Sequence, residues 1–82
     1  MRSLSKQQEE LLREIVSQRA PEWLARWDDI VAGRLSSEEI LELMNNVLGD
    51  EIMETGFLPG GEPTERGLKI EELIDWFSLQ LP

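Results

Sequence analysis

The sequence contains no cysteine, no histidine and no tyrosine among its 82 residues. Without Cys or His, the chain lacks the ordinary ligands of zinc, the nucleophile of cysteine enzymes, the base of a Ser-His-Asp triad and any disulfide. Histidine is also the side chain whose unperturbed pKa best suits a general base near neutral pH. We therefore expect no catalytic residue, no metal site and no cofactor, and interpret the protein as a non-enzyme; a carboxylate-based enzyme or metal-dependent hydrolase is the rival class.

Basic side chains are also few, with 8 Lys and Arg against 17 Asp and Glu, for a net charge of −9. Phosphate contacts need a clustered basic surface, so nucleic-acid binding is not expected. No apolar run approaches the roughly 20 residues that cross a bilayer, and the opening residues contain no apolar signal segment. We therefore expect no membrane association and a cytoplasmic location. A chain of this size and composition is expected to form one helical domain over residues 1–82.

The spacing of apolar residues is helical almost throughout the chain. Ser5 with Gln8, and Ser36 with Glu39, have the spacing of capping boxes and predict two helix starts. Gly33 suits the left-handed position that ends a helix. The predicted fold class is all-α, a compact bundle of four short amphipathic helices at about 5–19, 21–32, 37–55 and 68–79, with residues 57–67 as the one long loop.

Charge is distributed unevenly along the chain. Residues 1–34 carry equal numbers of acidic and basic side chains, whereas residues 35–82 carry eleven acids and two bases and hold the whole net charge. Acids in the first turn of a helix, such as Glu38, are stabilised by the exposed N–H groups and need no partner. The acids between Asp50 and Glu65 lack this explanation. They predict either a patch that meets a basic protein surface or a solvated end that only keeps the protein soluble.

Glu51 is one of two positions with more than one interpretation. On an unbroken helix it falls beside Ile40 and Met44 in the apolar stripe, where a buried carboxylate would need a partner such as an arginine or would have a raised pKa. Alternatively, Gly49 and Asp50 break the helix, and Asp50 caps a new turn that swings Glu51 outward. We favour the break, because glycine in a helix interior costs about 1 kcal/mol.

Trp76 is the other such position, because it lies beyond the edge of the core face of the last helix and next to Leu79. One interpretation is an exposed apolar patch of Trp76, Leu79 and Leu81 that serves a homodimer or a partner. The other, which we favour, is that the last helix is buried on two sides, because three tryptophans are mostly needed to fill so small a core. Trp23 and Trp27 lie within their apolar stripe and are expected in the core.

The last half of the chain resembles a known group of proteins. Residues 67–75 read Gly-Leu-x-Ile-Glu-x-Leu-Ile-Asp after an acidic loop that contains Pro63, and an earlier Leu-Ser-x-Glu-Glu helix starts at Leu35. This arrangement resembles the ending of small acidic helical bacterial proteins without assigned activity. The resemblance implies a bacterial cytoplasmic protein and brings no catalytic residue with it.

A looser resemblance is to the acidic helical immunity proteins that neutralise nuclease bacteriocins. These have similar length and charge, a Ser-Ser-Glu-Glu helix start and an acidic Gly/Pro loop before the last helix. Their binding motif includes a pair of tyrosines, whereas this chain contains none. The resemblance therefore extends only to the mode of recognition, in which an acidic helical protein binds its partner protein.

The function predicted from these patterns is a non-catalytic protein-interaction module whose acidic C-terminal half binds a basic protein surface, with an immunity- or antitoxin-like inhibitor as its most specific form. Acidic patches steer encounter more than they supply affinity, so apolar neighbours would have to anchor the complex. The alternative is a structural or regulatory homodimer that uses the apolar patch near Trp76, with the charge only solubilising. The candidate partner-binding residues are Asp50, Glu51, Glu54, Phe57, Leu58, Glu62, Glu65 and Trp76.

Overall fold

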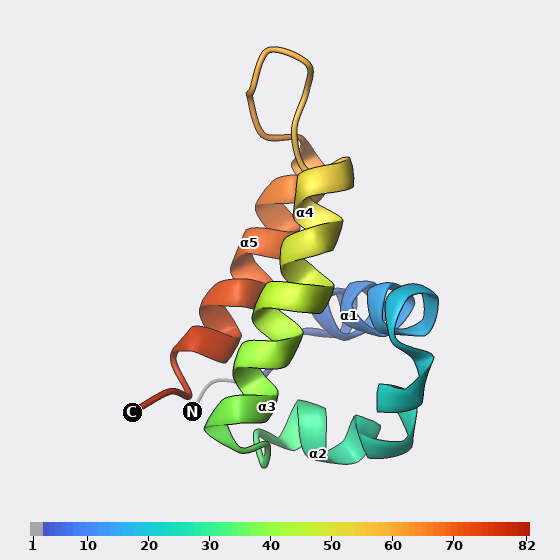
Figure 1. The fold of residues 1–82 in the computed structure, drawn as a ribbon, viewed down its shortest axis with the longest axis vertical. Helices are drawn as coiled ribbons and strands as arrows, with labels where there is room; N and C mark the ends of the chain where they lie inside the picture. The colour runs from blue at the N-terminus through green and yellow to red at the C-terminus, as the bar shows by residue number, and fades with distance from the viewer. Residues whose placement is uncertain (1–2) are drawn as a thin grey trace.

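A computed structural model describes residues 3–82 as a set of helices joined by short connections (Figure 1). The elements in chain order are α1 (Lys6–Arg19), the 3₁₀ segment η1 (Pro21–Arg26), α2 (Trp27–Ala32), α3 (Ser37–Glu42), the π-helical segment η2 (Leu43–Leu48), α4 (Gly49–Thr55) and α5 (Glu65–Ser78). Because η1 runs into α2 and η2 joins α3 to α4, these segments form four helical units. The predicted all-α bundle is confirmed.

Two helix starts have the geometry that their sequence spacing predicts. The Ser5 Oγ accepts a hydrogen bond from the Gln8 N–H (3.1 Å), and the Gln8 Oε1 accepts one from the Ser5 N–H (2.8 Å). Ser36 and Glu39 form the same reciprocal pair, with distances of 3.2 and 2.9 Å. Gly33 ends α2 in the left-handed region, at φ 73°. These bonds satisfy N–H groups that a helix start otherwise leaves unpaired.

Helix α5 begins at Glu65, three residues before its predicted start at about 68. The cause is Thr64, whose Oγ1 accepts a hydrogen bond from the Gly67 N–H at 2.9 Å. Gly67 then lies inside the helix because the end of α4 passes very close to it: a Cβ atom at Gly67 would lie 2.1 Å from the carbonyl oxygen of Gly56. The predicted loop is therefore shorter than expected, and Glu65 lies in a first helical turn.

The helix does not break at Gly49, so the favoured interpretation of that region was wrong. The Gly49 N–H donates to the carbonyl oxygen of Met44, five residues earlier, and the Gly49 backbone is helical at φ −61° and ψ −44°. A Cβ atom at Gly49 would lie 3.1 Å from the same oxygen. The chain thus passes Gly49 in a π-helical turn without breaking, and the helix continues into α4. Because the helix is continuous, Glu51 lies on the side that faces the interior.

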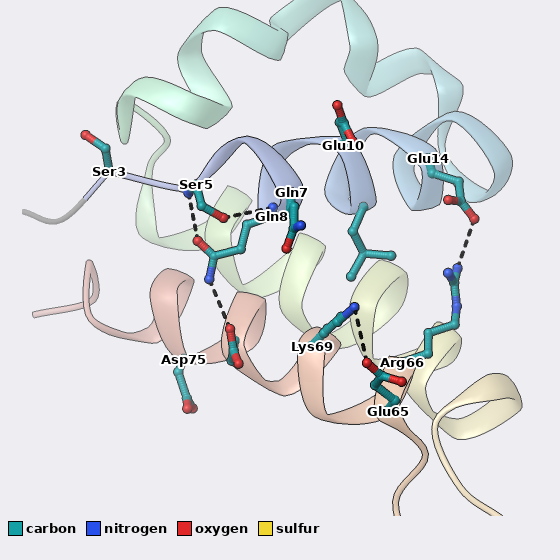
Figure 2. Close-up of a pocket in the computed structure, with 12 residues that line it drawn as sticks. Ser3, Ser5, Gln7, Gln8, Glu10, Glu14, Glu65, Arg66, Lys69 and Asp75 are labelled. Atoms are coloured by element: carbon teal, nitrogen blue, oxygen red, sulfur yellow. Dashed lines mark hydrogen bonds and ion pairs between the residues drawn. The ribbon is translucent and has the colours of Figure 1, made fainter.

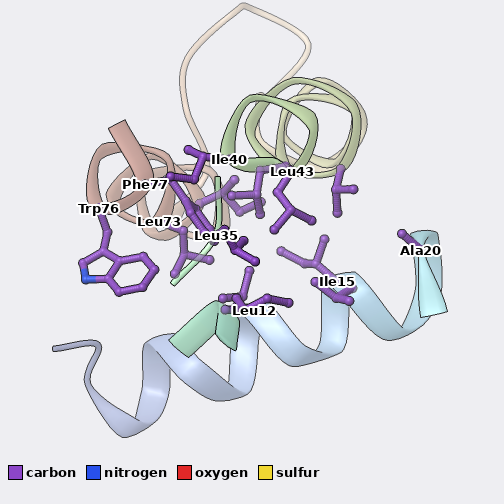
Figure 3. Packing of buried hydrophobic residues seen from close by; sticks show 14 residues of the cluster. Leu12, Ile15, Ala20, Leu35, Ile40, Leu43, Leu73, Trp76 and Phe77 are labelled. Atoms are coloured by element: carbon purple, nitrogen blue, oxygen red, sulfur yellow. The ribbon is translucent and has the colours of Figure 1, made fainter. Parts of the chain in front are cut away.

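The helical units pack in two layers around one apolar core. The long unit α3–η2–α4 and helix α5 run side by side, while α1 lies across them and η1–α2 closes the lower end in Figure 1. The buried apolar side chains form one cluster (Figure 3), made of Leu12, Ile15, Val16, Ala20, Ile30, Leu35, Ile40, Leu43, Val47, Leu48, Ile70, Leu73, Trp76 and Phe77. None of the helices within residues 3–82 has both the length and the apolar character that a bilayer span requires.

Trp76 belongs to this core, with only 1% of its surface exposed. Its ring meets that of Phe77 edge to face, with centroids 5.0 Å apart. The favoured interpretation, a last helix buried on two sides, is therefore confirmed. The interpretation of an exposed patch around Trp76 was wrong, and Trp76 is removed from the candidate partner-binding surface. Of that patch only Leu79 is largely exposed, at 73%, while Leu81 is half-buried.

Trp23 and Trp27 are less buried than predicted. Both are half-buried and pack against the edge of the core. The reason is that Pro21–Arg26 forms a 3₁₀ helix, whose three residues per turn do not keep the stripe that an α-helical period predicts. The guanidinium of Arg13 covers the exposed side of Trp27, 5.4 Å from the ring centroid.

Candidate functional site

Segment 56–64 folds back on itself and projects beyond the ends of α4 and α5, at the top of Figure 1; we call it the hairpin. The Leu58 N–H donates to the carbonyl oxygen of Glu62 at 2.7 Å, and the Gly61 N–H donates to that of Leu58 at 2.8 Å. Gly61 has φ 89°, where a residue with a side chain would be strained. The projecting segment is thus a hydrogen-bonded turn with a defined backbone conformation.

The base of the hairpin is tied to both neighbouring helices. Phe57 and Pro63 form an isolated antiparallel bridge. Below this bridge, the Thr64 N–H donates to the Gly56 carbonyl oxygen at 2.8 Å, and the Thr64 Oγ1 donates to the Thr55 carbonyl oxygen at 3.0 Å. The hairpin therefore continues the α4–α5 pair as an ordered extension.

Large apolar side chains are exposed at this end of the molecule. Phe57 is 40% exposed and Leu58 is 50% exposed, both in the hairpin itself. Met53 on α4 (74%) and Leu68 on α5 (49%) lie within about one helical turn of the contact between the two helices at Gly67. We call these four side chains the apolar end group. Exposed apolar side chains that gather at one end of a molecule are candidates for an interaction site.

Acidic side chains accompany the apolar end group. Glu54, Glu62 and Glu65 are all exposed, on α4, in the hairpin and in the first turn of α5. Glu65 lies 3.7 Å from Lys69, and Glu54 pairs with Arg19. Glu62 takes part in no ion pair within the part of the chain that the structure describes.

The structure separates the eight predicted partner-binding residues into two groups. Glu51 and Trp76 are buried. The exposed ones are Asp50, Glu54, Phe57, Leu58, Glu62 and Glu65. Among these, Asp50 lies farthest from the hairpin, more than a helical turn before the end of α4, so the other five define the candidate site.

Glu51 is only 4% exposed, so its prediction as a partner-binding residue was wrong. Its Oε1 accepts a hydrogen bond from the Arg19 Nε at 2.7 Å. Its Oε2 accepts from the Thr55 Oγ1 at 2.8 Å and from the Arg66 Nη2 at 3.3 Å. Arg66 also contacts Glu14 at 3.2 Å, so the group links α1, α4 and α5. Of these five residues only Glu51 is itself buried, and we name the group after it the buried ion cluster.

The electrostatics of the buried ion cluster keep Glu51 charged. Burial by itself raises the pKa of Glu51, but the hydrogen bonds from Arg19, Thr55 and Arg66 outweigh it and hold that pKa below its ordinary value. The hydrogen bond with Glu51 in turn raises the pKa of Arg19. Because Glu51 is buried and already accepts three internal hydrogen bonds, its carboxylate is poorly accessible to a partner protein.

Sequence reasoning missed Arg19 and Arg66 as the partners of Glu51. The apolar neighbours of Glu51 along its helix did predict that a buried carboxylate would need an arginine. Nothing in the local sequence indicates which one, because Arg19 lies 32 positions earlier and Arg66 lies 15 positions later. Met53 and Leu68 were also missed as exposed residues.

A groove lies between α1 and α5 (Figure 2). Its polar walls are bonded to each other: the Gln8 Nε2 donates to the Glu72 Oε2 at 3.2 Å, and Arg66 bridges to Glu14. The groove is therefore the polar contact zone between α1 and α5, whose side chains hydrogen-bond to each other. No group of three or more acidic side chains within residues 3–82 is arranged to hold a metal ion.

Comparison with known proteins gives no further assignment. The chain matches no protein-family model, and neither curated proteins nor solved structures gave a significant match. These comparisons therefore assign no role to the hairpin residues.

Proposed function

We propose that the protein is a non-catalytic interaction module that binds a basic protein surface through its hairpin end. The observation that carries this proposal is the exposure of Phe57 and Leu58 on a projecting, hydrogen-bonded hairpin that also carries the exposed carboxylate of Glu62.

The physical argument starts from how interfaces are built. Their energy is concentrated in a few apolar side chains that become fully desolvated, surrounded by a polar rim. Phe57 and Leu58 are suited to the first role, because each still exposes 40% or more of its surface. Glu54, Glu62 and Glu65 are suited to the rim, where carboxylates attract a cationic partner and disfavour an acidic one.

The internal hydrogen bonds of the hairpin support the same proposal. A loop that is already ordered loses little conformational entropy on binding. A projecting element also fits a recess better than a flat surface. An inhibitor of the immunity or antitoxin kind, whose hairpin enters a cationic cleft of its target, is the most specific form of this proposal.

The test is affinity capture from native lysate at low salt and at about 0.5 M salt, where exposed charges are largely screened. We expect a basic protein that is retained at low salt and released at high salt. The variant Phe57→Ser/Leu58→Ser should lose it, and so should Glu62→Lys/Glu65→Lys.

The matched control is Glu10→Lys/Glu22→Lys, which makes the same change of charge at exposed positions on α1 and η1. If this control abolishes capture as completely as the hairpin variants do, net charge and not the hairpin is responsible. Light scattering of the purified protein tests the homodimer. If the protein is a dimer and Phe57→Ser/Leu58→Ser converts it to a monomer, the hairpin serves self-association and the proposal of a basic partner is wrong.

A further inference from the structure

The hairpin is flanked by two residues that belong to the buried ion cluster. Thr55 is the last residue of α4, and Arg66 is the second residue of α5. The Arg66 Nε donates to the Thr55 Oγ1 at 3.3 Å, so these two side chains meet directly across the hairpin base. Glu51 lies beneath both and accepts a hydrogen bond from each.

We infer that Glu51 is a positioning residue for the hairpin: its buried carboxylate holds Thr55 and Arg66 together and so fixes the base that carries the exposed Phe57 and Leu58. This inference deepens the proposed function, and its consequence for binding rests on that function. The conformational part stands without any partner.

The geometry gives the reason. Arg19 anchors the other oxygen of Glu51 to α1, so the carboxylate is held from the opposite layer of the fold. The hydroxyl of Thr55 donates to Glu51, whose carboxylate lies at 2.8 Å and whose backbone carbonyl oxygen lies at 3.0 Å, and it accepts from Arg66. Holding the two ends of a loop together reduces the conformations that the loop can reach. The hairpin is therefore restrained at its base as well as by its own bonds.

A residue that only stabilised the whole fold would behave differently. Its removal would increase the exchange of amides that open by global unfolding, in every helix alike. A positioning residue acts on local opening, so its removal would increase exchange at the hairpin first. Three hairpin amides report this directly, because the N–H groups of Leu58, Gly61 and Thr64 each donate a backbone hydrogen bond.

The test is amide hydrogen exchange, followed by NMR, in the full chain. Thr55→Val removes the hydroxyl at an exposed position and is expected to fold, whereas Thr55→Ser keeps the hydroxyl. We expect Thr55→Val to speed exchange at the three hairpin amides by about tenfold, the size expected for loss of a hydrogen bond to a charged group. Thr55→Ser should restore the wild-type rates. Amides in the middle of α1 and α5 should change less.

The control is Ile30→Val, a buried substitution in α2 that does not touch the hairpin. It should speed the globally opening amides and leave the hairpin amides nearly unchanged. The inference is overturned if Thr55→Val leaves the hairpin amides at wild-type rates, or if it shifts the amides of every helix by the same factor.

Binding gives a second, separate readout. With the captured basic protein in hand, Thr55→Val should weaken its binding although every hairpin side chain is retained. If no basic partner is found, the proposed function fails while the exchange result stands. If a partner binds Thr55→Val as well as it binds the wild type, although exchange is faster, the link between hairpin order and recognition is wrong.

Discussion

Glu51 and Glu62 are carboxylates of the same acidic half of the chain, yet their surroundings are opposite. Glu51 lies beneath the hairpin, 4% exposed, with donors from Arg19, Thr55 and Arg66 around it. Glu62 lies in the hairpin itself, exposed, where its backbone oxygen closes the turn while its side chain faces solvent. One carboxylate is paired inside the fold, and the other is exposed to solvent.

Net charge alone therefore does not locate a binding surface. Burying a carboxylate is costly unless it is paired and hydrogen-bonded, so a buried acid has to be matched inside the molecule. An exposed acid carries no such requirement and contributes little to stability by itself. Substitutions at the base of the hairpin should therefore affect folding, and those at its tip should affect recognition.

Gly67→Ala should give the largest loss of stability. The new Cβ would lie 2.1 Å from the Gly56 carbonyl oxygen, so α4 and α5 would have to move apart. We expect a loss of about 3 kcal/mol in the free energy of unfolding, measured by urea denaturation. Gly60→Ala at the tip is the control, because its Cβ would meet nothing within 4 Å. Equal midpoints for the two variants would contradict the close helix contact.

Glu51→Gln should have the next largest effect. It leaves Arg19 and Arg66 without their shared anion, and since both guanidiniums are partly exposed we expect a loss of about 2 kcal/mol. Glu62→Gln, the matched change at the tip, should stay within about 0.5 kcal/mol of the wild type. Denaturation of both variants under the same conditions measures the difference. A wild-type midpoint for Glu51→Gln would show that the cluster does not stabilise the fold.

The pH dependence of stability sharpens the same contrast. Because the pKa of Glu51 is lower in the folded chain than its ordinary value of 4.5, its charged form favours folding. This contribution is present above 4.5 and is lost as the pH falls through the lower, folded value. The stability difference between wild type and Glu51→Gln should therefore shrink as denaturation is repeated from pH 7 down to about pH 3. A difference that stays constant over that range would contradict the shift.

The smallest effect on stability is expected at the tip. Leu58→Ser removes an apolar group that is 50% exposed, so the unfolding free energy should change by about 0.5 kcal/mol. Capture of a basic partner should nevertheless be weakened strongly. Leu79→Ser, at a 73% exposed position on the opposite end of α5, should change neither stability nor capture. If Leu79→Ser abolished capture, the binding surface would not be confined to the hairpin.

The helix starts that could be predicted are those whose signal is complete within a few residues. Ser5 with Gln8, and Ser36 with Glu39, each supply both halves of a capping box. The start of α5 was missed because Thr64 has only one half of that signal: it accepts from the N–H three residues on, but the residue there is a glycine, with no side chain to reach back.

The candidate site was predictable in part. Phe57, Leu58 and Glu62 lie in a segment whose prolines and glycines predict a loop, and loops lie on the surface. Glu54 was predicted without its ion-pair partner, Arg19, which comes from the neutral first part of the chain. The uneven charge along the sequence is thus partly balanced across the fold.

Local sequence patterns were enough to predict the helical class and the two complete capping boxes, and the composition fixes the net charge of −9 and the absence of any disulfide. The burial of Glu51 and the close helix contact at Gly67 could be known only from the packed fold. The physical reason is the distance along the sequence between the residues that interact. A capping hydrogen bond joins residues about three positions apart, so its pattern is visible locally. The ion pair between Arg19 and Glu51 joins positions 32 apart, and it exists only once α1 and α4 have packed against each other.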